Sequence, residues 1–283
     1  FHLTDLIFKK YKTKRLTISG GCAMNSLANG KIIHNSKFEE IYVSPSPGDA
    51  GGSIGSACIL IRNKYNKIVK VDNYSYLGPE YSNKYILKII NQKKLEHKFD
   101  IKFIEYDELY SFIADQLTKE KIIGWFQGKT EWGPRALGNR SILADARNEN
   151  IKDIINSKIK KRENFRPFAP SILKNHVSNW FEEECSVPFM SEVKIIRKDK
   201  RKLIPGVVHV DGTGRLQTVR HSDLSFMSIL LTRLGEYNEY PVLLNTSFNI
   251  AGKPILNTYR DAIWMLENTE MDGLVLEDYY IKK

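Results

Sequence analysis

Glycine and proline alternate with arginine in the stretch from Gly124 to Ser171, and this pattern restricts what that stretch can form. Its centre reads EWGPRALGNRS, with Arg135 and Arg140 close to three helix-breaking residues. A surface helix has no need of glycine and proline between its arginines. A loop that brings backbone N–H groups and guanidinium groups to an anion does need them. The stretch therefore predicts a phosphate-handling loop.

Composition places the chain among ordinary globular proteins. It has 283 residues, of which 42% are apolar and 27% charged, and this length predicts about two domains. No run of about 18 apolar residues and no signal peptide is visible, so we expect a cytoplasmic protein without a membrane partner. The net charge of +10 is compatible with nucleic acid, an acidic membrane or anionic substrates, but much of it is scattered lysine.

Cysteine and histidine give little sign of a metal or thiol site. The three cysteines form no CxxC pair, and we interpret them as reduced, buried thiols, with a thiol nucleophile as the weaker alternative. His209 is the one histidine in a suggestive setting, at the start of HVDGT, where it is either a catalytic base or a core or ligand-contacting residue. No P-loop pattern is present.

Polar clusters follow three predicted strands. The strand near residues 121–127 leads into the arginine loop, a strand–turn–strand is expected over 207–219, and the buried run Val242–Leu244 opens into NTSFN. Ligands of open α/β sheets bind at strand ends, so we expect these clusters to wrap one phosphate-bearing ligand, although any single arginine is more simply a surface ion pair. The candidates are Arg135, Arg140, Ser141, Lys160, Arg162, Arg166, His209, Arg215, Asn245, Ser247 and Asn249.

Near the start of the chain, RLTISGGCAMN predicts a strand, a tight turn at Gly20-Gly21 and a helix that begins near Met24. Such a turn presents free helix N–H groups to a nucleotide, or it merely allows close packing. Asp49 follows a proline- and glycine-rich loop. It is either a helix N-cap or a carboxylate that faces a metal or phosphate.

Six segments resemble, in order, the carbamoyltransferases of the NodU/CmcH type: GGCAMNSLANGKI, SPSPGDAGGSIGSA, EWGPRALGNRSILADAR, KIKKRENFRPFAPSIL, HVDGTGRLQTV and LLNTSFNIAGKPI. The resemblance implies an α/β chain with part of an actin/Hsp70-like (ASKHA) lobe over residues 1–80. A YrdC-like domain with a twisted open sheet is implied over residues 81–283. In such proteins, carbamoyl phosphate and ATP give carbamoyl-adenylate, and the carbamoyl group passes to a hydroxyl of a small molecule.

The resemblance also implies roles for single residues. Lys160, Arg166 and Arg215 are expected to be catalytic, and Ser247 and Asn249 to share their pocket for carbamoyl phosphate and ATP–Mg²⁺. Fixed cations suit this chemistry, because they hold two mutually repelling anions together. The further residues expected to line that pocket, or to face the nucleotide in the first domain, are Arg135, Arg140, Arg162, Gly20, Gly21 and Asn25. Asp49 matches a metal-binding aspartate.

The first domain of the resembling family is longer than residues 1–80, and its histidine metal ligands lie upstream of the glycine turn. We therefore expect either a fragment or one subunit of a split enzyme, with a separate polypeptide that carries the missing lobe. Fe²⁺ or another divalent metal is expected only once that lobe is present.

Three alternatives remain open. A threonylcarbamoyl-adenylate synthase for tRNA modification would require threonine and bicarbonate. A non-catalytic partner subunit would co-purify with the missing lobe. An RNA-binding module is disfavoured because no platform of alternating aromatic and basic residues is present, so we do not expect a nucleic-acid partner.

Overall fold

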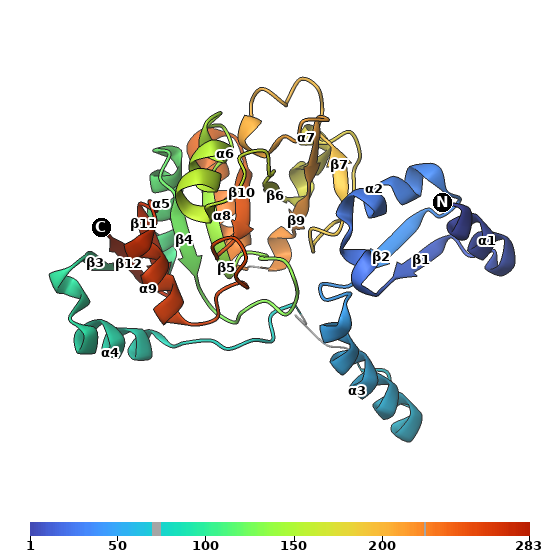
Figure 1. Cartoon of the computed structure of the whole chain (residues 1–283), viewed down its shortest axis with the longest axis horizontal. Helices are drawn as coiled ribbons and strands as arrows, with labels where there is room; N and C mark the ends of the chain where they lie inside the picture. The colour runs from blue at the N-terminus through green and yellow to red at the C-terminus, as the bar shows by residue number, and fades with distance from the viewer. Residues whose placement is uncertain (70–74, 224) are drawn as a thin grey trace.

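The computed structural model describes residues 1–69, 75–223 and 225–283. At its centre is an eight-stranded mixed sheet in the order β3-β12-β11-β4-β5-β10-β6-β9 (Figure 1). The α/β class expected from the sequence is confirmed. The strands are β3 (Asp100–Phe103), β4 (Ile123–Phe126), β5 (Arg140–Asp145), β6 (Ala169–Leu173), β9 (Gln217–Val219), β10 (Val242–Ser247), β11 (Gly273–Leu276) and β12 (Tyr279–Lys282).

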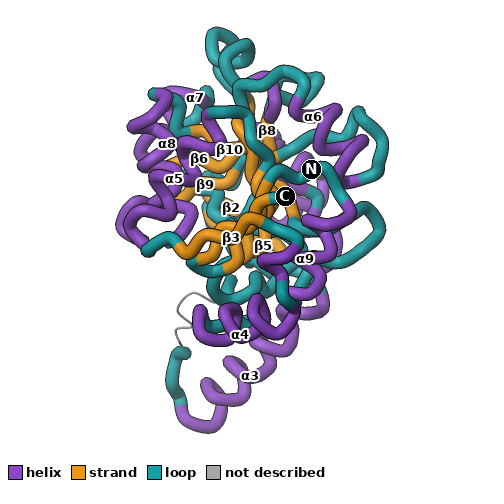
Figure 2. Tube along the Cα trace, turned by 90° about the vertical axis from the view of Figure 1, so that its left-hand side faces the viewer, coloured by secondary structure: helices purple, strands orange, loops and turns teal. Residues whose placement is uncertain are grey.

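Helices cover both faces of this sheet, as Figure 2 shows. On one face, α5 (Tyr106–Thr118) and α8 (Phe226–Asn238) pack on alternate strand residues such as Leu143 and Leu243. On the other face lie α4 (Asn83–Lys93), α6 (Ile151–Ile154), the π-helical turn η3 (Ile155–Lys160) and α9 (Tyr259–Asn268). Because both faces are covered, the central strands read as near-continuous apolar runs.

The expected strand–turn–strand over 207–219 is wrong in its first strand, because the 3₁₀ turn η5 (Pro205–Val207) and a loop stand before Thr213, whereas strand structure follows the turn. The strand β8 (Thr213–Arg215) pairs with β7 (Val193–Ile195) in a small separate sheet, whereas β9 pairs with β6 in the main sheet. Leu216 lies between β8 and β9 with its side chain fully buried in the core. Burial of this one residue carries the chain from the small sheet to the large one.

The N-terminal segment forms a βαβ unit. Strands β1 (Arg15–Ile18) and β2 (Glu40–Val43) are parallel, and α2 (Ser26–Asn35) connects them. The helices α1 (His2–Tyr11) and α3 (Asp49–Tyr65) bury none of their residues, and α3 projects from the body of the protein in Figure 1. The predicted strands and helices of this segment are confirmed, while the domain boundary at residue 80 stays a prediction.

Close backbone contacts join this unit to the rest of the protein. A Cβ on Gly30 of α2 would lie 2.2 Å from the carbonyl oxygen of Val193 in β7, so only glycine fits there without a shift. One residue earlier, the Asn29 amide donates to the carbonyls of Ser191 (2.9 Å) and Ala23 (2.8 Å). Helix α2 is therefore anchored on the β7 region by side-chain and backbone contacts.

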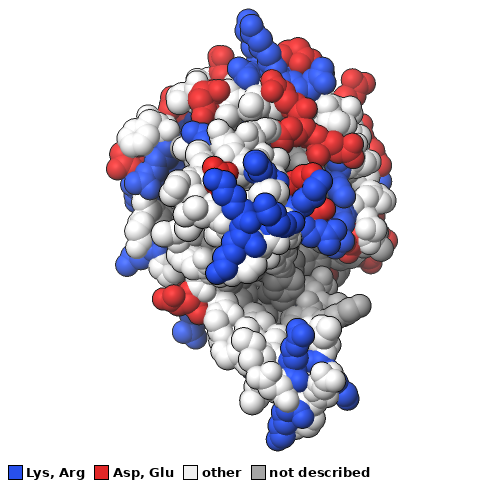
Figure 3. Space-filling model, turned by 90° about the vertical axis from the view of Figure 1, so that its right-hand side faces the viewer, with Lys and Arg blue, Asp and Glu red and all other residues white. Residues whose placement is uncertain are grey.

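Among the described residues, no helix is both long and apolar enough to cross a membrane. Lys and Arg side chains gather near the middle of the face that carries the N-terminal segment, as Figure 3 shows.

Candidate phosphate-binding site

The loop between β4 and β5 packs against the N-terminal segment of the chain. At Gly133 the backbone has a φ of +155°, and a Cβ there would lie 2.2 Å from the carbonyl oxygen of Pro45. Two residues later, Nη2 of Arg135 donates a 3.0 Å hydrogen bond to the carbonyl of Met24. The interleaved glycine and arginine of this loop therefore bring it against both loops of the N-terminal segment.

Arg140 lies apart from the other candidate cations. Its side chain is fully buried, with the guanidinium carbon 3.6 Å from the centre of the Phe126 ring. Burial lowers the pKa of Arg140 to about 10. Its terminal nitrogens donate to four backbone carbonyls, those of Pro79, Gln127, Gly128 and Asn139. These contacts give Arg140 a role in holding the loop, because its terminal N–H groups already have partners.

Lys160 is a buried cation in η3. Its Nζ donates to the carbonyl oxygen of Ser247, to Ser247 Oγ (3.2 Å) and to Asn249 Oδ1 (2.8 Å). Burial, and secondarily the nearby Arg162 guanidinium, lower the pKa of Lys160 well below its ordinary value. The structure thus brings together three residues expected to form one pocket.

Arg162 lies near Lys160, and two further arginines, Arg166 and Arg215, interact electrostatically with Arg162. Burial, followed by the charges of Arg135 and Arg162, lowers the pKa of Arg215 to about 9. Arg162 itself donates 2.7 Å to Asn156 Oδ1 and lies over the Phe168 ring. Arg166 is half exposed and pairs with Glu163 at 2.9 Å. Like charges held this close cost free energy unless an anion lies among them, so the cluster is suited to binding one.

Arg215 and His209 line a cavity of about 510 Å³ that also contains Ser26 and Leu27 of the N-terminal segment. His209 Nδ1 lies 3.3 Å from Thr213 Oγ1, while His209 Nε2 and Arg215 Nε are buried without a hydrogen-bond partner among the described residues. Burial lowers the pKa of His209, and the Arg215 charge adds to this effect. The imidazole is therefore mainly neutral at neutral pH.

Asn245 lies inside the sheet, in a buried polar network that sequence reasoning missed in part. Its amide nitrogen donates to Gln217 Oε1 (2.9 Å) and Ser171 Oγ (3.2 Å), and Gln217 donates to the carbonyl of Leu137 (2.8 Å). Ser141 is also fully buried, and its hydroxyl has no partner in the described part of the chain. Ser171 and Gln217 are polar residues within buried strands, and this pattern in the sequence could have indicated a buried polar network.

The N-terminal candidates lie on a separate turn. Gly20 has a φ of +94°, and its N–H donates 2.7 Å to the carbonyl of Pro47. It precedes Gly21, the first residue of the short 3₁₀ turn η1 (Gly21–Met24). Asn25 caps α2 by accepting a hydrogen bond from the Ala28 N–H at 3.0 Å. Capping accounts for Asn25 structurally and leaves its expected nucleotide contact untested.

Asp49 is exposed and is the first residue of α3, one position after the N-cap Gly48. Within residues 1–69, 75–223 and 225–283, no group of three or more His, Cys, Asp or Glu side chains is placed to hold a metal ion. The described residues do not fit a metal by themselves, and a metal at Asp49 would need ligands from elsewhere.

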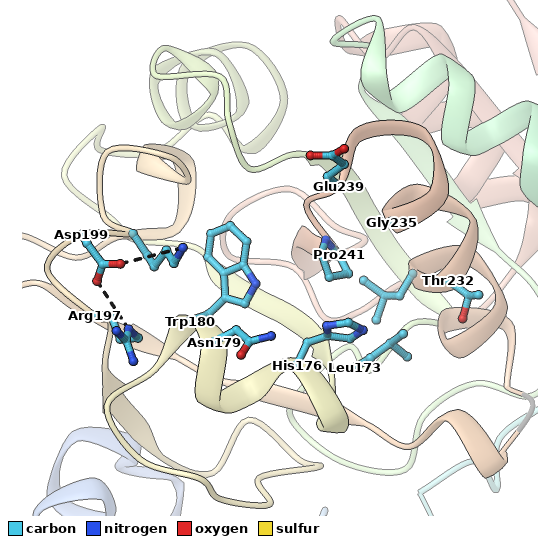
Figure 4. Close-up of a pocket in the computed structure, with 12 residues that line it drawn as sticks. Leu173, His176, Asn179, Trp180, Arg197, Asp199, Thr232, Gly235, Glu239 and Pro241 are labelled. Carbon is cyan, nitrogen blue, oxygen red and sulfur yellow. Dashed lines mark hydrogen bonds and ion pairs between the residues drawn. The ribbon is translucent and has the colours of Figure 1, made fainter.

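Two further cavities lie outside the cation cluster. One of about 960 Å³ is bordered by Lys129, Gln217, Arg220 and Phe226. The other, of about 530 Å³, is shown in Figure 4: Trp180 and His176 line it, and the Arg197–Asp199 ion pair lies at one side. This second cavity contains none of the residues expected from the sequence.

Comparison with known families identifies the chain. Residues 114–283 match the Carbamoyltransferase C-terminus family, and residues 1–58 match the Carbamoyltransferase N-terminus family. The chain belongs to the carbamoyltransferase family. The C-terminal match contains the cations Arg135, Lys160, Arg162, Arg166 and Arg215, whereas the N-terminal match contains Gly20, Gly21, Asn25 and Asp49.

Carbamoyltransferase relatives are similar along nearly the whole chain. Nodulation protein NolNO of Sinorhizobium fredii is 38% identical over 95% of this chain and 40% of its own length. The 3'-hydroxymethylcephem-O-carbamoyltransferase of Amycolatopsis lactamdurans is 30% identical over 95% of this chain and 49% of its own. The chain therefore spans about half the length of these relatives. A crystal structure of HypF from T. kodakarensis overlaps with a TM-score of 0.40 at 16% identity, over 65% of this chain and 22% of its own.

Proposed function

We propose that this chain is the C-terminal portion of an O-carbamoyltransferase. It activates carbamoyl phosphate with ATP as carbamoyl-adenylate, and the carbamoyl group then passes to a hydroxyl of a small-molecule acceptor. Family membership supports the reaction class. The observation that carries the assignment to these residues is the buried cluster of Lys160, Arg162 and Arg215. Burial lowers the pKa of each, and the Arg162 charge lowers the pKa values of the other two further.

The chemistry balances with one water. That water hydrolyses carbamoyl phosphate to carbamate and inorganic phosphate. A carbamate oxygen then attacks the α-phosphorus of ATP, forming a new P–O bond as the bond to pyrophosphate breaks and pyrophosphate leaves. Arg215 and Arg162 are placed to neutralise phosphate oxygens, so that the two anions can approach one another. Ser247 and Asn249 accept hydrogen bonds from Lys160 Nζ and so fix its position. When protonated, this amine places one compact positive charge at a defined point of the site. Mg²⁺ carried by ATP would supply further positive charge.

Two finer fold assignments belong to the same proposal. We assign residues 1–80 to the end of an ASKHA-type lobe and residues 81–283 to a YrdC-like domain. The parallel β1–α2–β2 unit with its Gly20 turn supports the first assignment, and the covered mixed sheet supports the second. Acceptor binding and a metal at Asp49 are expected in the completed first lobe, in the cytoplasm.

The partner we propose is a polypeptide, or a further part of the same chain, that carries the rest of the carbamoyltransferase length. Helices α1 and α3 bury no residue, and Leu3, Ile59 and Leu60 are more than 60% exposed. Exposed apolar side chains on two helices that bury no residue suit a protein surface of matching apolar character. The relatives NolNO and the cephem O-carbamoyltransferase extend well beyond the part that matches this chain, so their remaining length is sufficient to carry such a surface.

The test is ATP–pyrophosphate exchange by the purified chain with Mg²⁺, with and without carbamoyl phosphate. We expect exchange that requires carbamoyl phosphate and is lost in Arg166→Ala and Arg215→Ala. It should persist in Arg233→Ala, which removes only a surface ion pair with Glu236. Exchange that depends on threonine and bicarbonate would favour the threonylcarbamoyl-adenylate reaction. No exchange by the folded chain, even with the N-terminal half of a relative added, would overturn the proposal.

A further inference from the structure

Glu131 is a buried carboxylate at the start of the arginine loop. Its Oε1 atom accepts three backbone hydrogen bonds, from Leu137 (2.7 Å), Asn139 (2.9 Å) and Arg140 (3.2 Å). Only 7% of the residue is exposed, and Oε2 is buried without a hydrogen-bond partner among the described residues. One side chain therefore ties the end of the loop back to its beginning.

The hydrogen bonds of Glu131 matter for the candidate site because the loop that they close contains Arg135. Arg135 lies between the two tied ends of the loop and donates a hydrogen bond to the Met24 carbonyl. Its positive charge also lowers the pKa of Arg215. Gly133, two residues earlier, packs against Pro45 so closely that a Cβ would overlap the carbonyl. A loop with this much glycine has many alternative conformations, and charge-assisted bonds to three of its N–H groups remove most of them.

The charge of Glu131 fits this function better than a neutral side chain would. A carboxylate that accepts backbone N–H groups makes bonds roughly twice as strong as neutral ones. Arg140 is nearby, and the Glu131 charge favours its ionised form even though burial disfavours it. The carboxylate thus holds the loop both through N–H groups and through the buried guanidinium behind it.

We propose that Glu131 is a positioning residue of the candidate site: it shapes the 131–140 loop so that Arg135 meets a bound phosphate beside Arg215. The inference rests on the proposed function for its biological meaning. Its physical content, that Glu131 acts on anion binding through Arg135, does not depend on turnover. Inorganic pyrophosphate is therefore a suitable probe.

The experiment is a double-mutant cycle with Glu131→Gln and Arg135→Ala, with the dissociation constant of pyrophosphate measured by titration calorimetry on the full chain. We expect each single variant to weaken binding by about tenfold, a change of about 1.4 kcal/mol. The double variant should bind no more weakly than Arg135→Ala alone, since Glu131 has nothing left to position. Glu236→Gln, which removes a surface carboxylate, should leave binding unchanged.

Two further readouts separate positioning from folding. Amide exchange at Leu137, Asn139 and Arg140 should quicken in Glu131→Gln while the central strands stay protected, as measured by hydrogen-exchange NMR. In the exchange assay, the KM for carbamoyl phosphate should rise in this variant more than kcat falls. Additive effects in the cycle, unchanged pyrophosphate binding by Glu131→Gln, or no pyrophosphate binding by the wild type would each overturn the inference. Absence of ATP–pyrophosphate exchange with an intact binding cycle would count against the proposed function alone.

Discussion

Nζ of Lys160 donates a 2.8 Å hydrogen bond to Oδ1 of Asn249, which lies 89 residues later in the chain. The bond joins η3 to the loop after β10, and both partners come from segments that the sequence marks as polar. It keeps the Lys160 amine at a buried point of the site, where burial and the Arg162 charge lower its pKa.

From this arrangement we expect anion binding to be coupled to proton uptake at Lys160. A bound phosphate favours the charged ammonium, so the pKa of Lys160 rises on binding and a proton is taken up. The affinity for pyrophosphate should accordingly increase as the pH falls. Calorimetric titrations in two buffers of different ionisation enthalpy measure the uptake directly.

Lys160→Met should reduce that proton uptake together with the affinity. Arg233→Ala serves as the control for the loss of one positive charge elsewhere. Equal heats for the wild type in both buffers, after allowance for dilution, would contradict the coupling.

Glu277 is expected to make stability depend on pH. Burial raises its pKa to about 7, against 4.5 for the ordinary side chain, while Arg140 and the Gly128 N–H partly oppose the shift, and Asp278 and Glu80 add to it. The native state therefore binds more protons between pH 4.5 and 7. The contribution of Glu277 to stability is fully present below pH 4.5 and is lost as the pH rises through 7.

Glu277→Gln removes this dependence but keeps an acceptor for the Gly128 N–H. At pH 8 the variant should be more stable than the wild type, by on the order of 1–3 kcal/mol, and at pH 4.5 the gain should vanish. Urea unfolding at the two pH values measures the difference. A gain of the same size at both values would show that the carboxylate does not titrate as described.

Gly30→Ala should loosen the N-terminal segment, because its Cβ would lie 2.2 Å from the Val193 carbonyl oxygen. We expect a loss of about 1–3 kcal/mol and faster amide exchange along α2. Gly55 of α3 is the matched control, since nothing lies within 4 Å of a Cβ there. Gly55→Ala should stabilise its helix by up to about 1 kcal/mol, and similar effects of the two substitutions on urea unfolding would refute the close contact.

Gln217→Ala should destabilise the sheet by about 2–4 kcal/mol. It leaves the Leu137 carbonyl, the Ser171 hydroxyl and the Asn245 amide without their shared partner. Gln92→Ala, an exposed substitution in α4, should change stability by less than about 0.5 kcal/mol. If the two variants unfold at the same urea concentration, the network contributes little to stability.

The sequence predicted those features that depend on neighbouring residues. The buried strands and the irregular loop around Gly133 follow from local pattern, and the structure contains them. Arg135 and Arg140 show the limit: they share one motif, yet the side chain of Arg135 reaches Met24, whereas that of Arg140 is surrounded by carbonyls. Which way each side chain points is decided by strand β5 and by partners far away in the sequence.

The same limit explains the other differences. The first strand expected over 207–219 was wrong, since that segment forms η5 and a loop. The residues after the turn pair with distant strands, β8 with β7 and β9 with β6, which the local pattern does not reveal. Glu131 was not singled out, since a lone glutamate before tryptophan gives no sign that three backbone N–H groups will surround it.

The position of β12 in the main sheet has a consequence for synthesis on the ribosome. This strand, Tyr279–Lys282, lies between β3 and β11, so β3 has no strand to pair with until the residues of β12 have been translated. The nascent chain therefore exposes the edge of β3 while the residues between Phe103 and Tyr279 are translated. The edge of β4 that pairs with β11 stays exposed until Gly273–Leu276 have been translated. A chaperone that shields unpaired strand edges would be needed most during this interval, and slow codons between those for β3 and β12 would prolong it.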